Sequence, residues 1–182
     1  ASMALGGAAL QFPKNTEAAF RAAARMGAGA LGCEATFDKD GGLVCRIEQC
    51  DLHYTTDILL KTGSDDGASL KNNCTQPFAP GAGARCCASD FSASDLAKLC
   101  STMEMETDVS ATTVLSYLKL KDGEWQTTVY QDGMCHKVLQ QSEFIDLAQE
   151  LGVKMVSELK ALDPDANPLA SPLNTSMQVD RF

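Results

Sequence analysis

Residues 142–159 read SEFIDLAQELGVKMVSEL and combine the two signals that decide the fold. Apolar side chains recur at helical spacing over residues 143–151, so this stretch predicts an amphipathic helix, capped by Ser142 and ended by Gly152. A short apolar run follows at once and predicts a buried strand over residues 153–159. The apolar helix positions are Phe144, Leu147, Ala148 and Leu151.

The same pair of signals occurs near the N-terminus. Asn15 or Thr16 can cap a helix that runs to about Met26, where Gly27 ends it. Residues 28–37 then predict a second buried strand. Because helices alternate with buried strands, the sequence predicts an α/β fold with a parallel sheet or barrel. The inward helix positions are expected to be Phe20, Ala23, Ala24 and Met26.

The middle of the chain gives weaker signals. Residues 38–42 predict a hairpin-type turn before a strand over residues 43–47. Residues 51–90 are rich in Gly, Asn, Pro and Cys and predict a long loop, pinned or functional. Further short elements are expected after Ser92 or Ser94 (a helix to about Leu99), over residues 113–118 (a helix) and over residues 125–130 (an extended segment).

Length and charge exclude several classes of protein. The chain has 182 residues and a mass of 19.3 kDa, which is enough for one domain. Asp and Glu outnumber Lys and Arg by 24 to 15, giving a net charge of −9. Nucleic acids and anionic membranes attract clustered positive charge, so neither is expected as the main partner. No apolar run approaches the roughly 18 residues of a membrane-spanning helix.

Eight cysteines are the most unusual feature of the composition. No CxxC pair occurs and only His53 and His136 could add imidazole ligands, so zinc is a poor explanation. Disulfides in an oxidising compartment are favoured over free thiols in a reducing one. Adjacent Cys86 and Cys87 are expected to have different partners, and the connectivity stays open. The candidates around the long loop are Cys50, Cys74, Cys86, Cys87, Cys100 and Cys135.

The N-terminus bears on localisation. Residues 1–4 lack the charged segment and apolar core of a signal peptide. We expect that a targeting segment has already been removed and that the protein works in a secreted, periplasmic or organelle-lumen setting.

A series of short motifs occurs in one order along residues 5–162. The motifs are FPKNTEAAF (12–20), GAGA (27–30), TFDKDG (36–41), LVCR (43–46), QCDLH (49–53), TTD (55–57), CTQPF (74–78), CC (86–87), VKM (153–155) and ELK (158–160). Together they resemble the glycerophosphodiester phosphodiesterase family, especially its larger extracytoplasmic members. The resemblance implies a TIM-type (β/α) barrel. It also implies hydrolysis by two histidines and a divalent metal held by carboxylates.

The functional positions of that family are mostly changed here. The resemblance places Leu5 and Ile47 where the family has its two histidines, and neither side chain can carry a proton. It places Gly32 and Glu34 at the family's paired metal ligands, and Glu158 at its later strand carboxylate. We therefore expect no catalytic residue.

A metal site is the one remaining candidate. Glu34 and Glu158 could share a residual Ca²⁺ or Mg²⁺, although two carboxylates are few for cations that take about six oxygens. No other cofactor is expected. His53 and His136 are expected to be a hydrogen-bonded loop residue and a solvated loop residue.

The length points to an incomplete barrel. A TIM barrel takes about 250 residues, and in the family the strand carrying the Glu158 position lies only halfway round. We therefore expect about the first half of a barrel over residues 1–162, with roughly four of its strands, and an irregular C-terminal arm over residues 163–182. The open apolar edge needs cover. The tail from Leu162, a dimer of two halves or another protein could supply it, and another protein is favoured.

Three hypotheses about function follow. The first is a non-catalytic phosphodiesterase-like domain that serves as a structural or interaction subunit. The second is a metal-dependent phosphodiesterase with altered or residual activity that uses Glu34 and Glu158. The third is a module that binds a phosphate-bearing ligand through Arg46 and Lys160.

Overall fold

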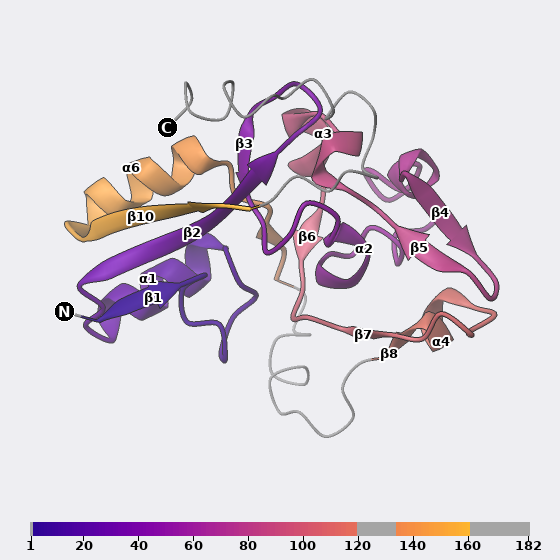
Figure 1. Cartoon of the computed structure of the whole chain (residues 1–182), viewed down its shortest axis with the longest axis horizontal. Coiled ribbons are helices and arrows are strands. Elements are labelled where there is room, and N and C mark those ends of the chain that lie inside the picture. The colour runs from indigo at the N-terminus through magenta and orange to yellow at the C-terminus, as the bar shows by residue number, and fades with distance from the viewer. Residues whose placement is uncertain (1, 120–133, 161–182) are drawn as a thin grey trace.

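Three parallel strands and one antiparallel strand form the central sheet of the computed structural model, which describes residues 2–119 and 134–160 (Figure 1). Strand β2 lies in the middle and pairs in parallel with β1 on one side and β10 on the other. The short β3 runs antiparallel to the end of β2. The strands are β1 (Met3–Leu5), β2 (Ala30–Phe37), β3 (Leu43–Cys45) and β10 (Lys154–Leu159).

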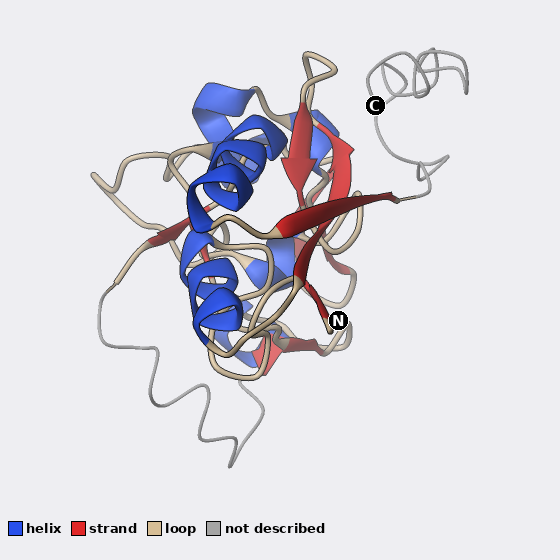
Figure 2. Ribbon diagram, turned by 90° about the vertical axis from the view of Figure 1, so that its left-hand side faces the viewer, coloured by secondary structure: helices blue, strands red, loops and turns tan. Residues whose placement is uncertain are grey.

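Two helices cover one face of this sheet, as Figure 2 shows. Helix α1 (Glu17–Arg25) connects β1 to β2, and α6 (Gln141–Leu151) precedes β10. The rings of Phe20 and Phe144 meet between the helices with centroids 4.7 Å apart. On the surface, Arg21 makes two 2.8 Å hydrogen bonds to the Glu150 carboxylate. The predicted α/β alternation of helices and parallel strands is therefore present.

The ends of both helices follow local chemistry. The side chain of Thr16 accepts a hydrogen bond from the Ala19 amide and caps α1, as predicted. Met26 was expected to face inward, but it lies just past the helix and is 62% exposed. The predicted cap at Ser142 is also wrong, because α6 begins at Gln141 with Gln140 as its cap. The buried residues of α1 are Ala19, Phe20, Ala22 and Ala23, so Ala24 is not among them.

Strand β10 forms where it was predicted, but it is not buried. Met155 and Val156 are 46% and 45% exposed. The reason is the position of β10 at the edge of the sheet, where β2 is its one neighbour among the described strands. An apolar run therefore predicted the strand correctly and its burial wrongly.

The segment between β3 and α6 builds a second core in place of a loop without structure. Side chains of Leu52, Ile58, Phe91, Leu99 and Tyr117 pack in this core. The predicted helices after Ser92 and Thr113 are present, although both are single turns. The elements are α2 (Leu52–Thr55), η1 (Leu70–Asn73), β4 (Gln76–Ala79), β5 (Gly83–Arg85), η2 (Ala88–Asp90), α3 (Ala93–Leu96), β6 (Cys100–Ser101), β7 (Glu106–Thr107), α4 (Val114–Tyr117), β8 (Leu118–Lys119) and β9 (His136–Lys137).

Two of the predicted segments concern residues that the structure does not describe. The extended segment expected at residues 125–130 and the arm expected at residues 163–182 both lie outside the described residues. Among the described residues, no helix combines the length and the apolar character needed to cross a membrane.

All eight cysteines form disulfides. The six candidates pair with one another, and Cys86 and Cys87 have different partners, as predicted. The bond between Cys33 on β2 and Cys45 on β3 was not among the candidates. The other bonds are Cys50–Cys87, Cys74–Cys86 and Cys100–Cys135.

Removing the Cys100–Cys135 bond should destabilise the chain. The two residues are 35 positions apart, so the bond restricts a long loop in the unfolded state. We expect the double variant Cys100→Ala, Cys135→Ala to lose up to about 4 kcal/mol of unfolding free energy. Urea unfolding without reductant measures the loss, and an unchanged midpoint would contradict this assignment.

Candidate functional site

The two candidate metal ligands lie side by side on neighbouring strands. Glu34 on β2 is directly opposite Glu158 on β10 in the parallel register. Both side chains point to the face of the sheet away from the helices, because Leu31, Cys33 and Ala35 occupy the helix side. Glu34 is only 6% exposed, whereas Glu158 is exposed. The sequence resemblance therefore identified two carboxylates that the fold does bring together.

Lys160 supplies the positive charge between them. Its Nζ lies 2.9 Å from Glu34 Oε1 and 3.0 Å from Glu158 Oε1. The hydrogen bond to Glu34, and then the one to Glu158, raise the pKa of Lys160 above its usual value. The lysine therefore stays an ammonium ion and offsets one of the two carboxylate charges.

The other oxygen of Glu34 is also engaged. Asn15 Nδ2 donates to Glu34 Oε2 at 3.3 Å, and the Glu34 backbone amide donates to Asn15 Oδ1 at the same distance. Asn15 is buried and has a φ of 59°, a left-handed conformation that asparagine tolerates better than most residues. The contact ties the loop before α1 to the middle of β2.

Leu5 and Ile47, which the resemblance set at the family's two histidine positions, have different structural roles. Leu5 ends β1 opposite Gly32, and a Cβ built on Gly32 would lie 2.9 Å from Leu5 Cδ1. The leucine side chain therefore uses the space that the missing side chain at position 32 leaves. Ile47 contributes its backbone amide, which donates to Asp51 Oδ2 at 3.0 Å.

These residues are a poor fit for a divalent cation. No group of three or more His, Cys, Asp or Glu side chains comes together within the part of the chain that the structure describes. Glu34 and Glu158 already share an ammonium, which would repel a second cation. Ca²⁺ or Mg²⁺ at this place stays a prediction that binding experiments can test.

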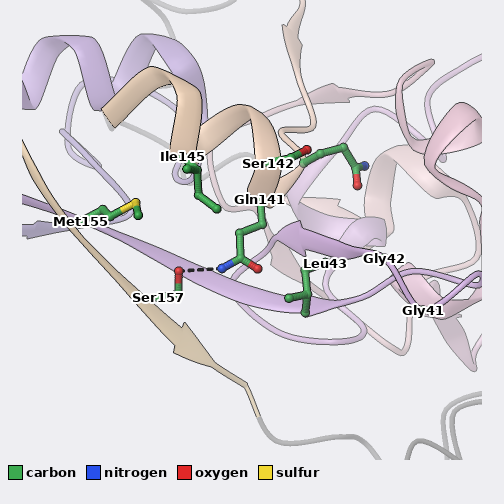
Figure 3. Close-up of a pocket in the computed structure, with 9 residues that line it drawn as sticks. Gly41, Gly42, Leu43, Gln141, Ser142, Ile145, Met155 and Ser157 are labelled. Carbon is green, nitrogen blue, oxygen red and sulfur yellow. Dashed lines mark hydrogen bonds between the residues drawn. The ribbon is translucent and has the colours of Figure 1, made fainter. Parts of the chain in front are cut away.

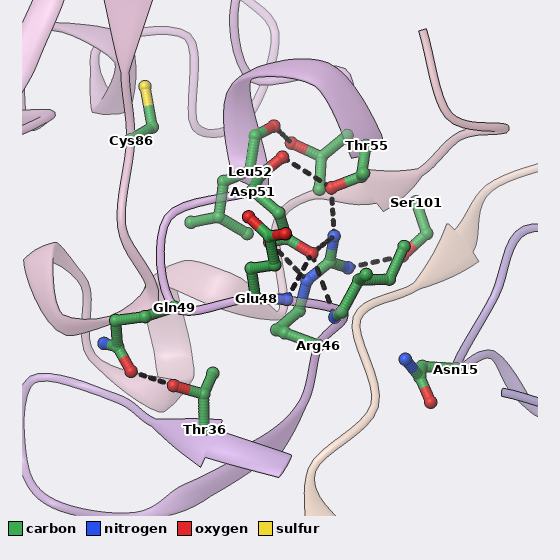
Figure 4. Close-up of polar contacts among 12 residues, drawn as sticks. Asn15, Thr36, Arg46, Glu48, Gln49, Asp51, Leu52, Thr55, Cys86 and Ser101 are labelled. Carbon is green, nitrogen blue, oxygen red and sulfur yellow. Dashed lines mark hydrogen bonds and ion pairs between the residues drawn. The ribbon is translucent and has the colours of Figure 1, made fainter. Parts of the chain in front are cut away.

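Arg46 and Asp51 form a buried ion pair in the loop between β3 and α2 (Figure 4). Arg46 is 2% exposed and Asp51 is fully buried. The guanidinium donates to both carboxylate oxygens, with Nε–Oδ1 at 3.0 Å and Nη2–Oδ2 at 3.1 Å. Arg46 also donates to Ser101 Oγ at 3.3 Å and to Thr55 Oγ1. The sequence did not reveal this pair, because an Arg and an Asp five residues apart are common on protein surfaces.

His53 makes the structural hydrogen bond expected of it, but it lies on helix α2 and not in a loop. Its Nδ1 accepts a hydrogen bond from the Cys86 amide at 3.4 Å, and its ring stacks on Tyr117. The pKa of His53 is lowered to about 4, chiefly by burial; nearby Asp51 opposes this shift and Arg85 adds to it. His136 was expected in a solvated loop. It lies instead on β9, partly buried, with its ring edge toward Phe12.

A groove of about 680 Å³ lies between the start of α6 and β10 (Figure 3). Gln141 bonds across it, with Nε2 donating to Ser157 Oγ at 2.7 Å, while Gln141 Oε1 is buried without a hydrogen-bond partner among the described residues. No sequence pattern pointed to this groove. Its lining residues are Gly41, Gly42, Leu43, Gln140, Gln141, Ser142, Ile145, Met155 and Ser157, none of which carries a charge.

Comparisons with known proteins give a result at the level of the fold. No protein-family model matches the chain, and no curated protein sequence does. A glycerophosphodiester phosphodiesterase from Agrobacterium tumefaciens matches 98% of the chain with a TM-score of 0.53 and 15% identity. An Oleispira antarctica phosphodiesterase, solved with its product sn-glycerol-3-phosphate, matches 87% with a TM-score of 0.53 and 17% identity.

The chain therefore has a glycerophosphodiester phosphodiesterase-like fold. It spans about half the length of these solved structures, covering 53% of the first and 44% of the second. At identities this low the likeness concerns the fold alone.

The low pKa of His53 predicts a specific loss of stability in acid. The folded state binds the proton at about pH 4, whereas the unfolded state binds it near pH 6.5. The stabilising contribution is therefore fully present above pH 6.5 and declines as the pH falls toward 4. Between pH 7 and 4.5 the wild type should lose roughly 2 to 3 kcal/mol more than the variant His53→Gln. Urea unfolding at both pH values measures this, and equal losses would contradict it.

The buried pair predicts a large effect of removing one partner. Asp51→Asn leaves the Arg46 guanidinium buried without its counter-charge, which should cost about 3 to 5 kcal/mol. Asp108→Asn is the matched control, because Asp108 bonds Lys119 at the surface and its loss should change the unfolding midpoint little. Equal effects of the two variants would show that the buried pair is not important for stability.

Proposed function

We propose that this chain is a non-catalytic, phosphodiesterase-like domain that serves as a structural or interaction subunit of a larger assembly. The observation that carries the proposal is the place of Lys160, whose ammonium joins Glu34 and Glu158. Leu5 and Ile47 support it, since neither can give or take a proton at the positions that resemble the family's histidines. The chain then keeps the scaffold and lacks the acid, the base and a free ligand set.

The proposal includes a partial TIM-type barrel over residues 1–162, with residues 163–182 as an arm. It is supported by three parallel strands joined through helices, and by solved structures about twice as long. The face of the sheet opposite the helices would be the barrel interior. Met3 and Leu5 are exposed on that face, as a partial barrel would leave them. A protein partner that covers the edge at β10 would solve this problem.

The proposed setting is an oxidising, extracytoplasmic compartment. Four disulfides favour such a compartment, where thiols are not kept reduced. The net charge of −9 favours protein partners over nucleic acid.

A second candidate function is residual metal-dependent phosphodiester hydrolysis. The register that sets Glu34 opposite Glu158 favours it, because two adjacent carboxylates can act as metal ligands or as an acid and a base. Phosphate binding is less well supported. Arg46 is buried against Asp51, and Lys160 is neutralised by two carboxylates.

An activity assay tests the proposal. We expect no hydrolysis of glycerophosphocholine above background with added Ca²⁺ or Mg²⁺. Hydrolysis that disappears in the variant Glu158→Ala would overturn the proposal and establish the second candidate.

Removing the ammonium should expose the carboxylates to cations. In the variant Lys160→Met, Glu34 and Glu158 lose their shared positive charge and repel each other. We expect this variant to bind Ca²⁺ at least tenfold more tightly than the wild type in calorimetry. Lys39→Met removes an exposed lysine at a turn and should bind as the wild type does. Tight Ca²⁺ binding by the wild type would show that Lys160 does not exclude the cation.

A further inference from the structure

The outer edge of β10 is open to another strand. The Lys154 amide donates to the Gly29 carbonyl just before β2, and the Lys160 amide donates to the Ala35 carbonyl on β2. The amides that alternate with these two along the strand therefore point outward. The outward groups belong to Met155 and Ser157, and neither backbone pairs with any described strand. The edge thus carries a row of donors and acceptors ready for pairing.

The sequence of this edge is complementary to itself. In an antiparallel pair of β10 strands centred on Val156, Lys154 of each copy stands opposite Glu158 of the other. Met155 then stands opposite Ser157, and these are the two residues whose backbone groups point outward. The hydrogen bonds and the charges are therefore satisfied in one and the same register.

The charged pairs would lie where side chains come closest. With Met155 and Ser157 as the hydrogen-bonded pairs, Lys154–Glu158 and Val156–Val156 become the non-hydrogen-bonded pairs, whose side chains are closer together. Lys154 is exposed and makes no ion pair with the described chain, so it is available to a second copy. Glu158 Oε1 bonds Lys160, and the Glu158 side chain is still 49% exposed.

Apolar side chains also fit the antiparallel register of two β10 strands. Val156 lies in register with Gly32, which is in register with Leu5, and all three point away from the helices. Val156 and Leu5 are exposed. Pairing two β10 strands would bring Val156 of each copy together and extend one apolar row across both sheets.

The geometry points to a second copy of this chain as the partner, joined by antiparallel pairing of the two β10 strands about a two-fold axis at Val156. This inference rests on the proposed structural role and deepens it by naming the partner. An isologous contact of this kind makes a closed dimer and leaves no further β10 edge exposed. The two sheets would form one continuous sheet with the order β1-β2-β10-β10-β2-β1.

Sedimentation and light scattering on the purified, unreduced chain test this inference. We expect a species of twice the 19.3 kDa chain mass that dissociates on dilution. Lys154→Glu sets like charges opposite each other at two symmetric places and should weaken the dimer at least tenfold. Lys39→Glu makes the same charge change at an exposed turn and should leave the dissociation constant unchanged. The double variant Lys154→Glu, Glu158→Lys restores the pairing with reversed signs and should recover the dimer.

A backbone variant tests the pairing without changing charge. Met155→Pro removes an outward amide and leaves the amides that bond β2 in place, a position that an edge strand tolerates. It should make the protein monomeric with its circular dichroism unchanged. A dimer insensitive to both Lys154→Glu and Met155→Pro would overturn the β10 contact.

The remaining outcomes separate this inference from the proposed function. If the purified chain is a monomer but forms a complex with a different chain in an unreduced extract, the second copy is overturned as the partner. The proposed structural role then stands. A monomer in both overturns both. A dimer that also hydrolyses glycerophosphocholine supports the second copy and overturns the non-catalytic role. If deleting residues 162–182 converts a monomer to the dimer, the tail covers β10 and the inference is overturned for the whole chain.

Discussion

The pair formed by Arg46 and Asp51 is the contact on which the two halves of the structure depend. Both charges have left water, and burial makes their attraction strong and the loss of either partner costly. Arg46 follows β3 of the sheet, Asp51 precedes α2 of the inserted segment, and Ser101 joins from β6. One guanidinium thus fixes the sheet to the second core. The Cys50–Cys87 disulfide and the His53 ring, which stacks on Tyr117, flank Asp51 in the sequence. Their positions therefore depend on where the ion pair holds Asp51.

A few residues hold the candidate site together. Lys160 lies one residue after β10 and places its ammonium between Glu34 and Glu158. The space at Gly32 is taken by Leu5, so the loss of one side chain accommodates the other. Both contacts follow from the register of the sheet.

The spacing of apolar residues correctly predicted the features that depend on interactions between residues close in the sequence. Thr16 and Gly152 mark helix ends through their own hydrogen bonds and dihedral angles, and Phe20 and Phe144 faced inward as their spacing required. The exposure of Met155 was missed because burial of a strand depends on neighbours that its own sequence does not encode. Lys160 was seen as a cation near the site, but its position between Glu34 and Glu158 needs the register of β10 on β2. The disulfide partners likewise follow from chain path, since spacing alone permits many connectivities.

The path of the chain also has a consequence for the order of folding. Lys154 pairs with Ala30, so the sheet is completed only after all the residues between them have been synthesised. Closing so long a loop is slow, because its entropy is lost before any contact is gained. The three disulfides between Cys50 and Cys135 all lie inside that loop and can be oxidised while β10 is still unmade. Cys50–Cys87 and Cys100–Cys135 each shorten the loop that β10 must close, so the oxidised chain should add its last strand faster than the reduced chain.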